Sequence, residues 1–176
     1  NKAFYSCKFI TENVFVPKNV TSIGEDAFGE IGCNAINVAE ENGSYCSIDG
    51  IVYSKDKKVL VVCPSGKSGT LVIPEGVTTI GNSAFRSCSA LSGTLVIPDS
   101  VTAIGDYAFI NCTGFAEISI GKNIETIGYN PFLSCYSLKT ISIDNKNVHI
   151  TAIKQADDGN GTIVRFYNPT DEVQKV

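Results

Sequence analysis

The sequence predicts a β-rich solenoid, a fold in which the chain winds into stacked coils around one long core. Composition is the first reason. Ile and Val number 36 and Leu only 6, and the 13 Thr bring the β-branched residues to 49, or 28% of the chain. Such side chains pack well on pleated strands and suit helices less. The second reason is an internal repeat of 23 to 24 residues, a period typical of solenoid proteins.

The repeat is carried by near-identical strings. LVIPEGVTTIGNSAFRSC begins at Leu71, LVIPDSVTAIGDYAFINC begins at Leu95, and a weaker copy runs from Ile118 to Cys135. A phenylalanine marks the same place in each copy, at spacings of 24, 57, 24 and 23 residues: Phe4, Phe28, Phe85, Phe109 and Phe132. Each copy is therefore one coil, and stacked coils bury a core that no single copy could bury.

Each coil is expected to open with a short strand that turns two apolar residues toward the core. Proline then stops the strand in three coils, because it cannot donate a ladder hydrogen bond. A Val-Thr-x-Ile-Gly segment follows, whose glycine turns the chain either because a Cβ would clash or because φ is positive. The expected inward strand pairs are Val14/Val16, Ile36/Val38, Leu71/Ile73, Leu95/Ile97, Ile118/Ile120 and Ile141/Ile143.

One coil is about 11 residues longer than the others, and we interpret residues 44–66 as a β-hairpin insertion with arms Ser47–Tyr53 and Val59–Cys63. Beyond Ile143 the repeat decays, but Val164 and Phe166 keep the spacing, so residues 144–167 are interpreted as a degenerate seventh coil. The solenoid domain is thus residues 1–167, followed by a polar tail, residues 168–176. Because the chain starts in mid-coil, we expect the native protein to extend upstream.

Several function classes are disfavoured. The charged fraction is 18% and the net charge is −4, which excludes a basic nucleic-acid-binding protein. No apolar run approaches the ~18 residues that span a bilayer, so this segment is not expected to insert into a membrane. No secretion signal is visible. No phosphate-binding glycine loop, CxxC pair or second histidine accompanies His149, which we expect to be a solvent-facing strand residue. We therefore expect no cofactor, no metal site and no catalytic residues.

The seven cysteines are interpreted mainly as core filler. Cys88, Cys112 and Cys135 hold the same place in successive coils, where stacking about 4.8 Å apart does not suit the roughly 3.8 Å Cβ separation of a disulfide. Cys46 and Cys63 lie on opposite arms of the expected hairpin, and the sequence leaves open whether they are bridged.

The motif IPxxVTxIGxxAFxxC, as it stands at Ile73–Cys88 and Ile97–Cys112, resembles the BspA-type leucine-rich repeat. Residues 42–67 resemble the hairpin insertion common in that family. The resemblance implies a leucine-rich-repeat right-handed superhelix of about seven coils. It also implies a cell-surface or secreted protein that is not an enzyme and that acts in adhesion or host-protein binding, with a host matrix or serum protein as the suspected partner.

If core packing fixes the inward strand residues, the alternate positions face outward and tile one sheet face, the usual recognition surface of a curved solenoid. We call these residues the sheet face: Asn13, Phe15, Asn37, Thr70, Val72, Thr94, Val96, Glu117, Ser119, Thr140 and Ser142. Two alternatives remain open. One is a structural spacer that presents another domain and has no ligand of its own. The other is an enzyme, such as a thiol hydrolase.

Overall fold

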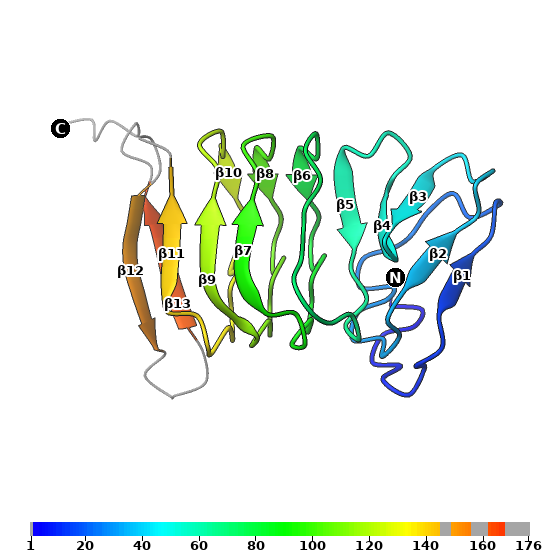
Figure 1. The fold of residues 1–176 in the computed structure, drawn as a ribbon, viewed down its shortest axis with the longest axis horizontal. Helices are drawn as coiled ribbons and strands as arrows, with labels where there is room; N and C mark the ends of the chain where they lie inside the picture. Colours follow the sequence, from blue (N-terminus) through cyan, green and yellow to red (C-terminus); the bar gives the residue numbers. More distant parts are fainter. Residues whose placement is uncertain (1, 145–148, 156–161, 168–176) are drawn as a thin grey trace, which may run out of the picture.

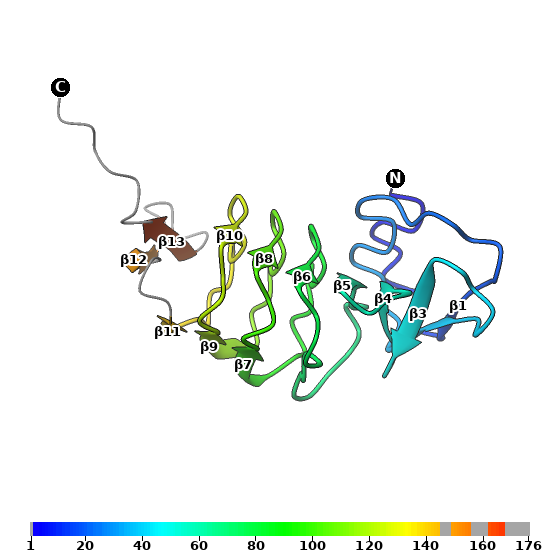
Figure 2. The ribbon, with the colours of Figure 1, turned by 90° about the horizontal axis from the view of Figure 1, so that it is seen from above.

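The structure is a computed structural model that describes residues 2–144, 149–155 and 162–167, with side chains described up to residue 144. These residues contain no helix, and short strands joined by turns wind into a row of stacked coils (Figure 1). Seen from above, the coils lie edge-on, with strands on both sides of the interior (Figure 2). The predicted solenoid is therefore confirmed.

One side of the array is a parallel sheet of β7 (Gly93–Ile97), β9 (Phe115–Ile120) and β11 (Thr140–Ile143). Its register aligns equivalent residues of consecutive coils, so that Leu95 lies opposite Ile118 and Ile118 opposite Ile141. All three are buried, as are most of the other expected inward strand residues. Only three of that set are half-buried: Val14, Val38 and Ile143.

The other side is a row of two-residue strands in parallel register: β6 (Thr79–Ile80), β8 (Ala103–Ile104) and β10 (Thr126–Ile127). The glycine that follows β8 and the one that follows β10 are required by packing. A Cβ on Gly105 would lie 2.6 Å from the backbone nitrogen of Asn82, and one on Gly128 would lie 2.6 Å from that of Asp106. Positive φ falls two residues after the glycine instead, at Asp26, Ser83, Tyr107 and Asn130.

The repeated phenylalanines form a stack inside the array. The ring of Phe109 lies 4.9 Å from that of Phe85 and 5.4 Å from that of Phe132, nearly parallel to both. All three rings are essentially fully buried. A second, shorter stack joins Phe4 and Phe28 at 5.4 Å. The aromatic stack is thus broken once, between Phe28 and Phe85, where the long coil lies.

The long coil contains two hairpins, so the single hairpin that we expected is wrong. Its strands are β3 (Tyr45–Ile48), β4 (Ile51–Ser54) and β5 (Val59–Val62), paired antiparallel in that order. The first turn is Asp49-Gly50, where φ is +49° and +73°. Two positive φ values are what a tight two-residue hairpin turn requires, and Asp-Gly is a strong sequence signal for it. That turn splits the expected arm Ser47–Tyr53.

The insertion is a wall between two parts of the core. On β4 and β5, Tyr53 and Leu60 pack with the coils that follow, whereas Val52 and Val62 pack with the coils that precede. All four side chains are buried. Because β5 also pairs in parallel with β6, the insertion continues the second strand row toward the N-terminus.

Asn42 marks the point where the long coil departs from the repeat. It is fully buried, at the inward position that Val77, Val101 and Ile124 hold in other coils. Its Nδ2 donates to the carbonyl oxygens of Pro17 and Val20 at 2.9 and 3.0 Å. Its Oδ1 accepts from the N–H groups of residues 44 and 45 at 2.9 and 2.8 Å. The amide therefore fastens the insertion to the preceding coil.

The expected seventh rung at Val164 and Phe166 is wrong. β12 (His149–Gln155) and β13 (Thr162–Tyr167) pair antiparallel, so this segment is a hairpin. Only six residues separate the two strands, and a parallel return needs a connection of about a dozen or more. His149 does begin a strand, but its side chain lies outside the described residues, as does the expected tail 168–176.

Candidate protein-binding face

The structure places ten of the eleven sheet-face residues at exposed positions, with Ser119 half-buried. In the sheet of β7, β9 and β11 they form two rows of aligned residues. Thr94, Glu117 and Thr140 form one row, and Val96, Ser119 and Ser142 form the other. Within the first row, Thr94 Oγ1 donates to Glu117 Oε2 at 3.2 Å.

The sheet face is not continuous along the array. β1 (Val14–Val16) and β2 (Ile36–Val38) form a separate two-stranded sheet in which Phe15 lies opposite Asn37. The insertion follows β2 and packs against it, since the N–H of Ile36 donates to the carbonyl of Gly50 and that of Val38 to the hydroxyl of Ser47. Figure 1 shows β1 and β2 inclined to the central strands. The expected single surface is therefore two surfaces.

The apolar members of the face separate accordingly. Val72 and Val96 are 79% and 56% exposed and hold the same position in consecutive coils. Val72 lies just outside the named strands, yet its neighbours Leu71 and Ile73 are buried as the repeat requires. We call Val72 and Val96 the valine patch. Phe15, 63% exposed, instead lines a hollow of about 370 Å³ at the N-terminal end of the array.

The cysteines are free thiols, so the Cys46–Cys63 bridge that the sequence left open does not form. Their register explains this, because Cys46 lies opposite Tyr53, which in turn pairs with Leu60. The buried thiols also donate hydrogen bonds, which sequence reasoning missed. Cys112 Sγ lies 2.9 Å from the carbonyl oxygen of Phe85, and Cys135 Sγ lies 3.1 Å from that of Phe109.

Burial disfavours the thiolate form of the stacked cysteines. It raises the pKa of Cys88 and Cys112 well above the ordinary thiol range and that of Cys135 to about 12. A thiolate nucleophile needs the opposite shift together with access to substrate. Over the part of the chain that the structure describes, no cluster of three or more His, Cys, Asp or Glu could hold a metal ion. The same residues include no helix able to cross a membrane.

A cleft that sequence reasoning missed lies where the aromatic stack is broken; we call it the notch. It has a volume of about 240 Å³ and is lined by residues 23–29, 59, 61–62 and 81–83. Its cause is a local shortening. Leu60 pairs with Ile80, and the N–H of Cys63 donates to Ala84 O as that of Phe85 does to Ala108 O. Cys63 follows Leu60 by three residues, whereas in the next coil Phe85 follows the equivalent Ile80 by five. The long coil is therefore two residues shorter at this point, and it lacks the loop that the next coil has here.

Comparisons with known proteins agree with this geometry. The model of the BspA type leucine rich repeat region matches six copies over residues 1–54 and 64–156, which is most of the chain. The chain belongs to the BspA-type leucine-rich repeat family. Its six matched copies agree roughly with the seven coils expected, and the gap in the match falls on the second hairpin of the insertion. Repeats of this kind generally serve in protein–protein interaction and are typically not enzymes.

Two solved structures resemble the fold of this leucine-rich repeat chain. A leucine-rich repeat protein from Eubacterium ventriosum is 30% identical with a TM-score of 0.70, over 76% of this chain and 36% of that one. A leucine-rich cell surface protein from Faecalibacterium prausnitzii is 24% identical with a TM-score of 0.56, over 76% and 48%. This chain thus spans less than half of either. Among curated proteins, no sequence matches it.

A second family model, the C-terminal beta sandwich domain of glycosyl hydrolases family 38, matches residues 147–176. That stretch covers a small part of the chain, and its side chains lie outside the described residues.

Proposed function

We propose that this chain is a non-enzymatic interaction module of a cell-surface or secreted protein, and that it binds a host matrix or serum protein through the valine patch. The observation that carries the proposal is the exposure of Val72 and Val96, 79% and 56%, above a buried core row. Exposed apolar residues ringed by polar ones are a common design for a protein-binding patch. Thr70, Thr94 and Ser119 border the patch, and Glu117, Thr140 and Ser142 continue the polar surface across β9 and β11.

The test replaces Val72→Asp together with Val96→Lys and measures binding to a panel of extracellular-matrix and serum proteins. Both side chains point away from the core, so the free energy of unfolding should change by no more than about 0.5 kcal/mol. Loss of the apolar centre should weaken binding at least about tenfold. A matched control, Ser89→Asp with Ala90→Lys, makes the same charge changes on an exposed connection outside the patch.

The outcomes separate the proposal from its alternatives. Weaker binding by the valine variant alone supports recognition through the valine patch. Equal binding by parent and variant would place recognition elsewhere on the module. Absence of binding by the parent would favour a spacer that presents another domain.

A further inference from the structure

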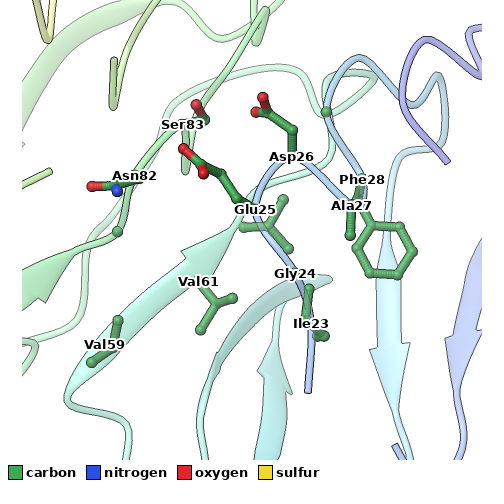
Figure 3. Close-up of a pocket in the computed structure, with 13 residues that line it drawn as sticks. Ile23, Gly24, Glu25, Asp26, Ala27, Phe28, Val59, Val61, Asn82 and Ser83 are labelled. Atoms are coloured by element: carbon green, nitrogen blue, oxygen red, sulfur yellow. The ribbon is translucent and has the colours of Figure 1, made fainter. Parts of the chain in front are cut away.

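We propose that the notch binds an extended peptide segment that carries a lysine or arginine. The segment would complete the backbone hydrogen-bond ladder between Leu60 and Cys63, where the chain is two residues shorter than in the next coil. This second recognition surface is independent of the valine patch. The proposal is carried by unpaired backbone groups on both walls of the notch and by two carboxylates among the residues that line it (Figure 3).

The unpaired groups are revealed by comparison with the regular coils. There, the N–H of Ser83 donates to Asp106 O at 2.9 Å and that of Phe85 to Ala108 O at 2.7 Å. The equivalents in the coil before the notch are Asp26 and Phe28, and their N–H groups have no acceptor among the residues that the structure describes.

The facing wall, at Asn82, also has unpaired backbone groups. Asp106 holds the equivalent position in the next coil, where its carbonyl oxygen accepts from the N–H of Ser83 and its N–H donates to Asn82 Oδ1 at 3.0 Å. Neither the backbone carbonyl nor the backbone N–H of Asn82 itself has a partner within the described part of the chain. The loop that the long coil lacks would have supplied the partners of Asp26 and Asn82.

An extended peptide is the ligand that fits this arrangement. Its carbonyl and N–H groups project to opposite sides, so one segment can accept from Asp26 on one wall and donate to Asn82 on the other. Addition of a strand to unpaired backbone groups is a recurring mode of peptide recognition, with side chains adding specificity. Val61 and Val62, which line the notch, supply apolar contact.

The charge of the notch selects a cationic side chain. Asp26 Oδ1 is a buried oxygen with no hydrogen-bond partner. In Figure 3 the carboxylates of Glu25 and Asp26 point to the side on which Ser83 lies. No described cation pairs with either carboxylate, because Arg86, the nearby arginine of the following coil, instead contacts Glu30 at 3.6 Å and Tyr5 at 2.9 Å. A carboxylate without a cation favours a basic partner.

The experiment titrates the ¹⁵N-labelled chain with two N-acetylated pentapeptide amides, Thr-Val-Lys-Val-Thr and Thr-Val-Glu-Val-Thr. The amide signals of Asp26, Phe28 and Asn82 report the notch. With the lysine peptide we expect all three signals to shift, and that of Asp26 to move downfield because its N–H donates to the peptide carbonyl. Charge complementarity should make the lysine peptide bind at least about tenfold more tightly than the glutamate peptide.

Charge variants complete the test. Glu25→Gln with Asp26→Asn should erase most of the preference for lysine, whereas Glu75→Gln with Glu125→Gln makes the same change of net charge outside the notch and should preserve it. If the first pair does not fold, the exposed Glu25→Gln alone serves, with about a threefold loss expected. Val72→Asp with Val96→Lys should not alter peptide binding. Unmoved notch amides at millimolar lysine peptide, or no preference for lysine over glutamate, would overturn the proposal.

Discussion

Replacing Phe109 with alanine tests the stacked core most severely. The ring is fully buried and lies between two parallel rings, at 4.9 and 5.4 Å. Truncation of a buried phenylalanine costs about 3–5 kcal/mol, and each lost aromatic contact adds about 0.5–1.5 kcal/mol beyond area burial. We therefore expect the upper part of the first range, near 5 kcal/mol, measured by urea unfolding followed by far-ultraviolet circular dichroism.

Two other phenylalanines calibrate this measurement. Phe9 is 99% exposed, so Phe9→Ala should change the free energy of unfolding by no more than about 0.5 kcal/mol. Phe4 is 43% exposed and stacks on Phe28 alone, so Phe4→Ala should fall between the two. Because coils contact mainly their neighbours, Phe109→Ala should also make unfolding less cooperative. Similar costs for Phe109→Ala and Phe9→Ala would refute the inward assignment of the repeated phenylalanine.

Four further predictions concern the thiols and Asn42. Thermal melts with and without reductant should coincide, because the cysteines are free thiols. Iodoacetamide should label Cys7 and Cys46 well before Cys88, Cys112 and Cys135. Faster labelling of these three would contradict their burial. Since burial holds the pKa of Cys135 at about 12, the unfolded chain releases thiol protons first, so stability should fall as pH rises from about 9 to 12; a flat profile in urea titrations would argue against buried thiols. Asn42→Val restores the residue type of the repeat but should lower the free energy of unfolding in urea by about 2–4 kcal/mol, because the backbone groups that the amide satisfies lose their hydrogen-bond partners. A stabilised variant would refute that role.

The regular coils could be predicted from sequence because one constraint repeats. An inward residue such as Leu95 or Ile118 must be apolar in every coil, so the period and the strand faces are visible in the residues themselves. Exposure of Val96 follows from the same alternation. Features that recur in every coil can therefore be predicted from the sequence.

The notch could not be read in the same way. It arises from a shortening by two residues, and that shortening is defined only once Leu60 is paired with Ile80 and Cys63 with Ala84. Two signals were nevertheless present. Asn42 at an inward valine position marks where the coil departs from the repeat, and Asp49-Gly50 marks the extra turn. The terminal hairpin was missed because residue spacing alone does not distinguish a parallel from an antiparallel return.

Hydrogen exchange resolved by residue, on the free protein, tests most directly whether the ladder is interrupted where the long coil is short. The backbone N–H groups of Ser83, Phe85 and Tyr107 donate to the next coil and should exchange slowly. Asp26 and Phe28 hold the equivalent positions before the notch, and their N–H groups should exchange quickly. Equal, strong protection at all five positions would contradict the account, because it would mean that the ladder runs unbroken through the long coil.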